Sequence, residues 1–285
     1  MRSTSSLISM ALNTTMMSSK QRGTLIVIAG PTGSGKTTLA VELAGRLGAP
    51  VISTDSRQVF RGMAIGTAQP SPEELSAVKH YFIADRDISD DYTAGKFEKE
   101  AIELLDMLFE TNEYVIAVGG SGLYINALCH GFDDMPTANE EIRAQLSGRL
   151  AAEGLGVLVT ELRQLDPAYS EEVDLSNPAR VIRALEVCIA SGKPYSALRK
   201  GHKAVRDFRI IKFAVDMPRE ELYMRINQRV DMMIAAGLED EAKALSPYRD
   251  MNALQTVGYK ELFDYFDGNS TFDEAVELIK RNSRR

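Results

Sequence analysis

The chain has 285 residues, of which 44% are hydrophobic and 26% are charged, and its formal net charge is −7. This composition is typical of a globular protein with one large domain or two ordinary ones. No stretch approaches the ~18 consecutive apolar residues of a membrane-spanning helix, and the two cysteines lie far apart without C-x-x-C spacing, so the sequence argues against a membrane span, a disulfide framework and a zinc site.

The first half of the chain alternates predicted strands with predicted helices. Residues 1–22 are rich in Ser, Thr and Met and are expected to form a disordered leader. Apolar, β-branched runs then predict strands at 24–30, 50–54, 80–84 and 114–118, and apolar residues at helical spacing or helix-start signals predict helices at 35–47, 71–75, 94–112 and 122–129. Such alternation predicts an α/β fold with a parallel sheet that is covered on both faces.

The pattern changes after Gly131, where helical spacing predominates as far as Val205. Helices are expected at 138–153, 155–165 and 177–192, followed by a strand at 208–216 and a helix at 218–236. A sheet strand that follows ~75 helical residues favours an insertion over a structureless loop of that length. The sequence therefore predicts a core formed by 23–130 and 206–285, with an all-helical insertion at 131–205.

The junction between the first strand and the first helix reads GPTGSGKT, with the G-x-x-x-x-G-K-[ST] spacing of a phosphate-binding P-loop. Backbone N–H groups and the helix dipole would attract an anion there, Lys36 adds a full positive charge, and the Thr37 hydroxyl can ligate Mg²⁺. The residues predicted to hold a diphosphate or triphosphate are Gly30, Pro31, Thr32, Gly33, Ser34, Gly35, Lys36 and Thr37.

Sequence features typical of GTPases and ATP hydrolases do not occur in this sequence. No N-K-x-D sequence for guanine recognition occurs, and the strand at 114–118 runs into GGSG without the carboxylate that an ATP hydrolase needs. A small-molecule kinase remains open, because Asp55 follows the second strand, where such kinases carry an acid. A nucleotide-binding regulatory module whose insertion docks a protein partner also remains open.

Six sequence blocks occur in the order GPTGSGKT, VISTDSRQVFRGMAIGTAQP, VGGSGLY, NPARVIRALEV, RINQRV and TVGYKEL. Over residues 24–285 their order and spacing resemble those of bacterial tRNA dimethylallyltransferases. That family transfers a dimethylallyl group from dimethylallyl diphosphate to N6 of the adenosine at tRNA position 37, beside the anticodon, and releases diphosphate. The resemblance implies a P-loop NTPase-like core with a helical insertion, Mg²⁺ as cofactor, and a monomeric cytoplasmic enzyme acting on the anticodon stem-loop.

The resemblance also implies roles for residues at the reacting centre. Diphosphate would be the leaving group, so Lys36, Mg²⁺ and the loop amides would absorb its developing charge. Asp55 matches the family's general base, with a turn cap or a support for Mg²⁺ as the alternatives. Ser121 stands where most relatives have Thr and is expected near the base, or else as a helix N-cap. Arg229 matches an arginine at the diphosphate.

Further residues match segments that contact tRNA in the family. Asp55, Ser56, Arg57 and Gln58 match the segment that meets the flipped-out adenosine, and the amide of Gln58 suits a purine edge. On the insertion the matching residues are Arg143, Ala179, Arg180, Val181, Ile182 and Arg183. For each arginine a surface ion pair is the competing interpretation.

Two basic clusters stand out in this acidic chain. Residues 193–212 contain Lys193, Arg199, Lys200, Lys203, Arg206, Arg209 and Lys212 against the single acid Asp207, and the sequence finishes IKRNSRR. Either a solvated helical face or a polyanion site explains such clusters, and two of them favour the polyanion site. Family members continue beyond this point with another basic stretch, so part of the RNA surface is expected to lie beyond Arg285.

Overall fold

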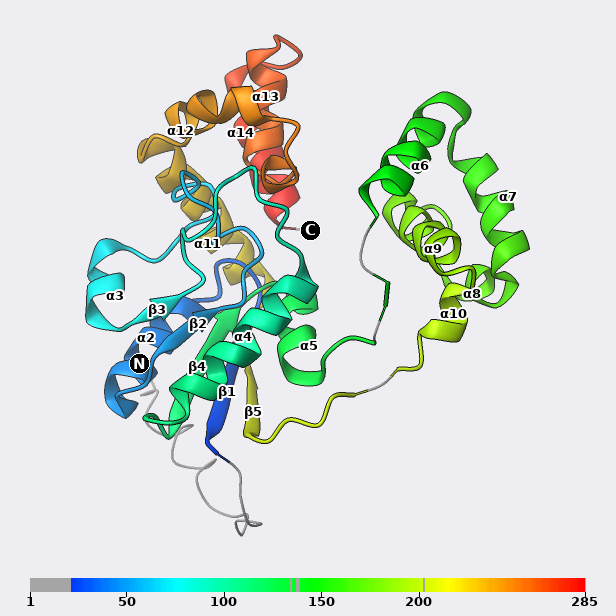
Figure 1. Ribbon diagram of the computed structural model, residues 1–285. Coiled ribbons are helices and arrows are strands. Elements are labelled where there is room, and N and C mark those ends of the chain that lie inside the picture. Colours follow the sequence, from blue (N-terminus) through cyan, green and yellow to red (C-terminus); the bar gives the residue numbers. More distant parts are fainter. Residues whose placement is uncertain (1–21, 134, 137–138, 202, 285) are drawn as a thin grey trace. The chain divides into compact units, whose positions relative to one another are not determined.

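The computed structural model describes residues 22–284, apart from 134, 137, 138 and 202. In chain order the elements are β1 (Thr24–Ala29), α2 (Lys36–Leu47), β2 (Val51–Ser53), α3 (Pro72–Ala77), β3 (His80–Tyr81), α4 (Ala94–Leu108), β4 (Tyr114–Gly119), α5 (Gly122–His130), α6 (Glu140–Glu153), α7 (Leu155–Leu165), α8 (Pro167–Glu172), α9 (Pro178–Ser191), α10 (Tyr195–Leu198), β5 (Arg209–Ala214), α11 (Arg219–Ala235), α12 (Leu238–Leu245), α13 (Tyr259–Phe266) and α14 (Phe272–Ser283), with 3-10 turns at Ser246–Tyr248 and Asn252–Leu254 (Figure 1).

The chain divides into two compact units. The core unit contains the described residues up to Cys129 together with those from Arg206 on, and the helical unit is His130–Val205. The expected leader lies outside the described residues except for Arg22. That residue belongs to the core unit, because its backbone N–H donates to the carbonyl of Asp207 and its side chain pairs with Asp207 and Asp106. Including Arg22 in the leader was therefore wrong.

The core unit is built on a five-stranded sheet in the order β3-β2-β4-β1-β5. Every pair of neighbours is parallel, which confirms the predicted α/β class. The third strand is shorter than the 80–84 expected and ends at Tyr81. Phe82 and Ala84 have φ values of 60° and 47°, and this left-handed backbone interrupts the extended conformation.

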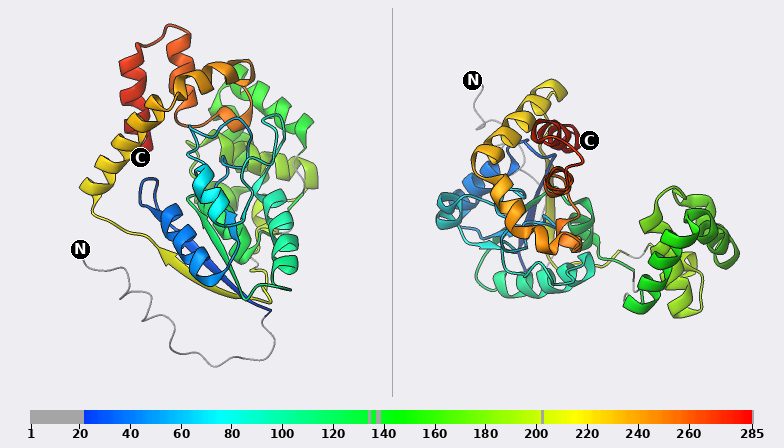
Figure 2. Two further views of the ribbon diagram at one scale, coloured as in Figure 1. Left: turned by 90° about the vertical axis from the view of Figure 1, so that its left-hand side faces the viewer. Right: turned by 90° about the horizontal axis from the view of Figure 1, so that it is seen from above.

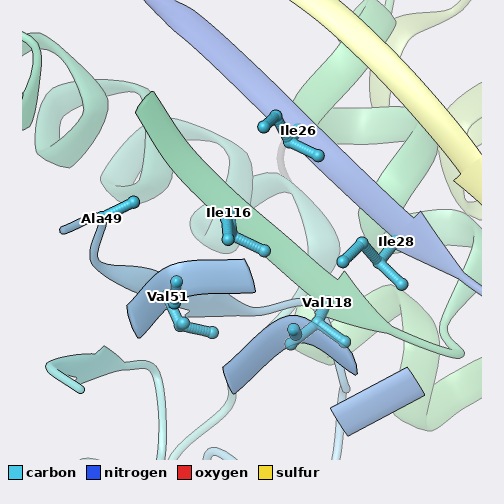
Figure 3. Packing of buried hydrophobic residues seen from close by; sticks show 8 residues of the cluster. Ile26, Ile28, Ala49, Val51, Ile116 and Val118 are labelled. Carbon is cyan, nitrogen blue, oxygen red and sulfur yellow. The ribbon is translucent and has the colours of Figure 1, made fainter. Parts of the chain in front are cut away.

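Alternate residues of the central strands form one apolar layer under α2. Ile26 and Ile28 of β1 lie beside Ile116 and Val118 of β4, with Val51 of β2 in the same cluster (Figure 3). The small residues Ala40 and Ala44 of α2 complete this cluster and are fully buried. Each fully buried Val or Ile side chain contributes roughly 1.5–3 kcal/mol. This packing fixes α2, and with it the loop that precedes α2, against the sheet.

Four helices, α11 to α14, follow the last strand and lie at the edge of the sheet where the parallel strands end (Figures 1 and 2). The hydrophobic pattern predicts α11, but no helix after residue 236 was expected from it. A usable signal was present in "TFDE", because Thr271 and Glu274 form a capping box at the start of α14.

The helical unit packs α6, α7 and α9 around a core of its own. Leu146, Leu158, Leu162, Val181 and Leu185 are all buried there. Two short helices, α8 and α10, were not expected. They are tied together by buried Asp166, whose carboxylate accepts from the backbone N–H groups of Tyr169 and Ser196 and from the Ser196 hydroxyl. No described helix has the length and apolarity needed to cross a membrane.

Candidate active site

The P-loop connects β1 to α2 with the backbone that its glycines permit. Gly33 and Gly35 have φ values of 82° and 83°, a conformation that glycine adopts at little cost. At Gly33 a Cβ would also lie 3.2 Å from the Ile226 side chain. Lys36 is the first residue of α2, and its Nζ donates to the Pro31 carbonyl at 3.2 Å. The lysine is thus folded back along the loop.

A cavity of about 320 Å³ opens at the P-loop. Thr32, Lys36 and Thr37 line it together with Asp55, Arg57 and Gln58 after β2, Gly119 at the end of β4, and Arg229 of α11. Ile226, Val230, Met233, Leu238 and Ile279 add apolar walls, and Asn282 and Ser283 come from the last helix. The structure therefore brings the predicted P-loop residues Lys36 and Thr37, the candidate base and the candidate diphosphate arginine to one cavity.

Two partly buried cations, Lys36 and Arg229, make the cavity suited to an anion. Burial lowers the pKa of Lys36, and the nearby Arg229 lowers it further. Burial also lowers the pKa of Arg229, whose Nε is buried without a hydrogen-bond partner among the described residues. A diphosphate would supply both the negative charge and the acceptors that these cations need.

Asp55 is held in a turn directly after β2. Its Oδ1 accepts from the backbone N–H groups of Arg57 at 2.9 Å and Gln58 at 3.3 Å, and its own N–H donates to Ser53 Oγ at 3.3 Å. None of the described residues donates a hydrogen bond to Oδ2. One oxygen therefore caps the turn while the other remains available for a proton, so the turn cap and the general base are compatible roles.

Ser121 joins the end of β4 to the Asp55 segment. Its Oγ accepts from the backbone N–H of Ser56 at 3.0 Å and donates to Ser56 Oγ at 3.2 Å. The two segments approach closely just before this point, since a Cβ at Gly119 would lie 2.4 Å from Thr54 Oγ1. The structure thus bonds Ser121 to Ser56, the residue after the candidate base; the family resemblance implied a place for Ser121 near that base but not this contact.

Arg57 and Gln58 are engaged within the chain. Arg57 donates to the Asn252 carbonyl at 2.6 Å, and burial lowers its pKa. The Gln58 Oε1 accepts from Ser53 Oγ at 3.0 Å, while its Nε2 donates to the carbonyls of Thr67 and Ala68. The expected contact between the Gln58 amide and a purine edge is thus not available in this structure, where the amide joins β2 to the loop after it.

The loop after β2 is held at Ile65 and Gly66 by helices α12 and α13, which were not expected from the sequence. Glu241 of α12 accepts from the backbone N–H groups of Ile65 and Gly66 at 2.9 and 2.8 Å, and from the Tyr259 hydroxyl at 2.7 Å. Burial and the carboxylate raise the pKa of Tyr259. The signal was the TVGYKEL block, since Thr256, Val257 and Gly258 line the cavity just before Tyr259.

Replacing Gly66 by Ala is expected to lower the free energy of unfolding by about 1–3 kcal/mol, as overpacking does. The new Cβ would lie 2.5 Å from the Tyr259 ring. Gly45→Ala in α2 is the matched control, because nothing lies within 4 Å of a Cβ there and the change should add about 0.5–1 kcal/mol. Urea unfolding measures both, and equal midpoints for the two variants would contradict the expected packing.

The insertion residues fall into different environments within the helical unit. Arg180 and Ala179 are exposed near the start of α9, and Ile182 is half-buried. Val181 has 0% of its surface exposed and packs in the core, so its side chain was wrongly included among the RNA contacts. Arg143 and Arg183 are partly exposed and pair with the same carboxylate, Glu186.

The basic cluster at 193–212 is divided between the two units. Lys193, Arg199, Lys200 and Lys203 belong to the helical unit, whereas Arg206, Arg209 and Lys212 belong to the core unit. Arg199 pairs with Glu172 at 2.6 Å. Arg206 pairs with Glu98 and donates to the carbonyls that end α5, with 12% of its side chain exposed. Arg199 and Arg206 thus each pair with an acid, and the polyanion site expected over this range stays a prediction.

Thr37 and Asp55 are oxygen donors at the same cavity. Among the described residues no group of three or more His, Cys, Asp or Glu side chains could hold a metal ion. Mg²⁺ commonly takes one or two protein oxygens and completes its shell with substrate phosphates and water. The donor set here fits that mode of binding and does not fit a site built from protein ligands alone.

Comparison with known proteins places this geometry in a family. A family model described as IPP transferase matches residues 58–285. The protein named tRNA dimethylallyltransferase 2 of Parabacteroides distasonis is 49% identical over 260 residues, which cover 91% of this chain and 87% of that protein. Another protein of that name, from Porphyromonas gingivalis, is 48% identical over 264 residues, covering 93% and 88%.

Solved structures of tRNA prenyltransferases are also similar to this chain. The tRNA isopentenylpyrophosphate transferase of Bacillus halodurans matches with a TM-score of 0.64 at 40% identity, covering 92% of this chain and 83% of that one. A eukaryotic dimethylallyltransferase acting on tRNA matches with a TM-score of 0.76 at 25% identity, covering 92% and 67%. These likenesses confirm the expected fold class, a P-loop NTPase-like parallel sheet.

Proposed function

The chain belongs to the tRNA dimethylallyltransferases of the IPP transferase family, and we propose that its P-loop holds the leaving diphosphate while Asp55 acts as the general base. The enzyme prenylates tRNA. The proposed donor is dimethylallyl diphosphate and the proposed acceptor is N6 of the adenosine at position 37. The observation that carries the proposal is the shared cavity of Lys36, Thr37, Asp55 and Arg229.

The proposed reaction forms one bond and breaks one. The adenosine amine attacks the allylic carbon, the C–O bond to diphosphate breaks, and the amine proton passes to Asp55 Oδ2. Negative charge would grow on the diphosphate as it leaves, and Lys36 and Arg229 at the cavity, with the loop N–H groups, would stabilise it. The phosphate is held throughout and never transferred. This separates the proposal from a kinase that shares the P-loop.

Mg²⁺ is the proposed cofactor; the Thr37 hydroxyl would be its protein ligand, and Asp55, which lines the same cavity, would support its water shell. When bound, it would neutralise charge on the diphosphate. We further propose that the enzyme acts as a monomer in the cytoplasm, where its tRNA substrate is found. The helical unit would contact tRNA phosphates through Arg143, Arg180 and Arg183, while Ser56 and Arg57 in the core unit would meet the unstacked loop.

Radiolabelled dimethylallyl diphosphate tests the proposal when incubated with tRNA that lacks the modification. After digestion to nucleosides, the label is expected on N6 of one adenosine, released diphosphate should match it in amount, and both should require Mg²⁺. A parallel incubation with γ-labelled ATP should give no phosphorylated product. Label at another atom, or phosphoryl transfer from ATP, would contradict the proposed reaction.

Arg180→Ala is expected to weaken tRNA binding about equally for all tRNA sequences. Arg180 is exposed, and losing one phosphate contact should reduce the slope of log affinity against log salt by about one unit. Filter retention over a salt series measures the slope. Lys99→Ala in the core unit is the matched control for lost charge. Identical slopes for Arg180→Ala and the unaltered chain would show that the RNA docks elsewhere.

A further inference from the structure

A buried carboxylate in the helical unit holds two arginines at once. Glu186 of α9 is 1% exposed, and its Oε2 accepts from Arg143 at 3.0 Å and from Arg183 at 3.1 Å. Its Oε1 accepts from the backbone N–H of Asn139, the N-cap of α6, at 2.8 Å. Arg183 also donates to the Pro136 carbonyl at 3.2 Å. One carboxylate thus connects the start of α6 with two guanidinium groups.

Glu186 is paired with more positive charge than its burial requires. A buried carboxylate needs a partner, because an unpaired buried charge is strongly destabilising. One arginine would meet that need, whereas Arg143 and Arg183 together leave a net positive charge. Their side chains remain 45% and 34% exposed. Each guanidinium has five N–H donors, of which Arg143 uses one and Arg183 two in bonds to described residues. The surplus charge and the spare donors are available to an anion from solution.

We propose that Glu186 is a positioning residue for tRNA binding, and that it acts through Arg143 and Arg183. By holding both guanidinium groups, the carboxylate orders two long side chains before the RNA arrives. The arginines can then meet neighbouring phosphates without losing further rotamer freedom on binding. This inference rests on the proposed function, in which the helical unit contacts tRNA phosphates.

Positioning and simple electrostatics predict opposite results when Glu186 is neutralised. Glu186→Gln removes a negative charge beside the proposed phosphate contacts, so electrostatics alone would strengthen tRNA binding. If the carboxylate positions the arginines, the same change releases them and weakens binding. Glu186→Asp keeps the charge but withdraws the carboxylate from both arginines, so only the positioning role is sensitive to it.

The experiment measures tRNA affinity by filter retention, together with kcat at saturating tRNA and the KM for dimethylallyl diphosphate. Glu186→Gln and Glu186→Asp are each expected to weaken tRNA binding about tenfold, with kcat and the diphosphate KM unchanged. Glu141→Gln is the matched control, because it removes an exposed charge from the first turn of α6. We expect that control to bind tRNA as tightly as the unaltered chain, or slightly more tightly.

Tighter or unchanged tRNA binding by Glu186→Gln, or unchanged binding by Glu186→Asp, would overturn the positioning role. Arg143→Ala separates this failure from that of the proposed function, since a silent Arg143→Ala would show that tRNA does not dock on this surface at all. If circular dichroism shows that the Glu186 variants fail to fold, Arg143→Lys provides the test. It keeps a cation beside Glu186 but loses the guanidinium fork, and it should also bind tRNA several-fold more weakly, whereas unchanged binding would overturn the inference.

Discussion

Asp55→Asn is expected to lower kcat by about 10²-fold or more while leaving the binding of both substrates nearly unchanged, because removal of a general base costs ~10²–10⁴-fold. An asparagine Oδ1 can still accept from the backbone N–H groups of Arg57 and Gln58, so the turn is preserved. What is lost is the basic oxygen, Oδ2. Single-turnover transfer of labelled dimethylallyl groups to tRNA measures the chemical step directly.

Asp240→Asn is the control for this variant. It makes the same chemical change at an exposed position of α12 and should leave turnover unaltered. If Asp55 served only as a turn cap, Asp55→Asn would turn over nearly as fast as the unaltered enzyme. That result would remove Asp55 from the proposed mechanism without affecting the assignment of the family.

Lys36→Ala is expected to raise the KM for dimethylallyl diphosphate and also to lower kcat by about 10²-fold or more, since deleting one preorganised donor to a developing anion has effects of that order. The lysine would touch the diphosphate both before and during its departure. Steady-state kinetics with saturating tRNA separates the two effects, and tRNA affinity should stay unchanged.

Lys243→Ala, at an exposed position of α12, controls for the lost charge. An unchanged KM for dimethylallyl diphosphate in Lys36→Ala would contradict the assignment of the P-loop as the diphosphate site. A raised KM with an unchanged kcat would mean that Lys36 contributes only to ground-state binding.

The parts of the site that the sequence predicted are those determined locally. The P-loop is one continuous strand–turn–helix segment, and its glycines and lysine can be read without knowing the rest of the fold. Asp55 could likewise be placed after a strand, because the carboxyl ends of parallel strands share one edge of a sheet. The role of Arg229 came from the family resemblance alone.

Other roles depend on long-range contacts that no local pattern encodes. The Gln58 amide has donors and an acceptor that suit adenine. In the fold, however, the loop after β2 brings the carbonyls of Thr67 and Ala68 next to Gln58 Nε2, which donates to both. Val181 belongs to a matching sequence block, yet its place on α9 turns it into the core. The amphipathic pattern of α9 was readable in advance, and weighing it would have removed Val181 from the RNA contacts.

The cavity wall supplied by α14 has a consequence for the synthesis of the protein. Thr32 and Ser283 line the same cavity, although almost the whole described chain separates them. At ~5–20 residues per second, a ribosome needs roughly 10–50 s to travel from one to the other. During that interval the nascent chain carries a P-loop without its opposite wall, and Glu241 and Tyr259 have not yet fixed the loop at Gly66. The phosphate site is therefore among the first segments to leave the ribosome and among the last to be enclosed.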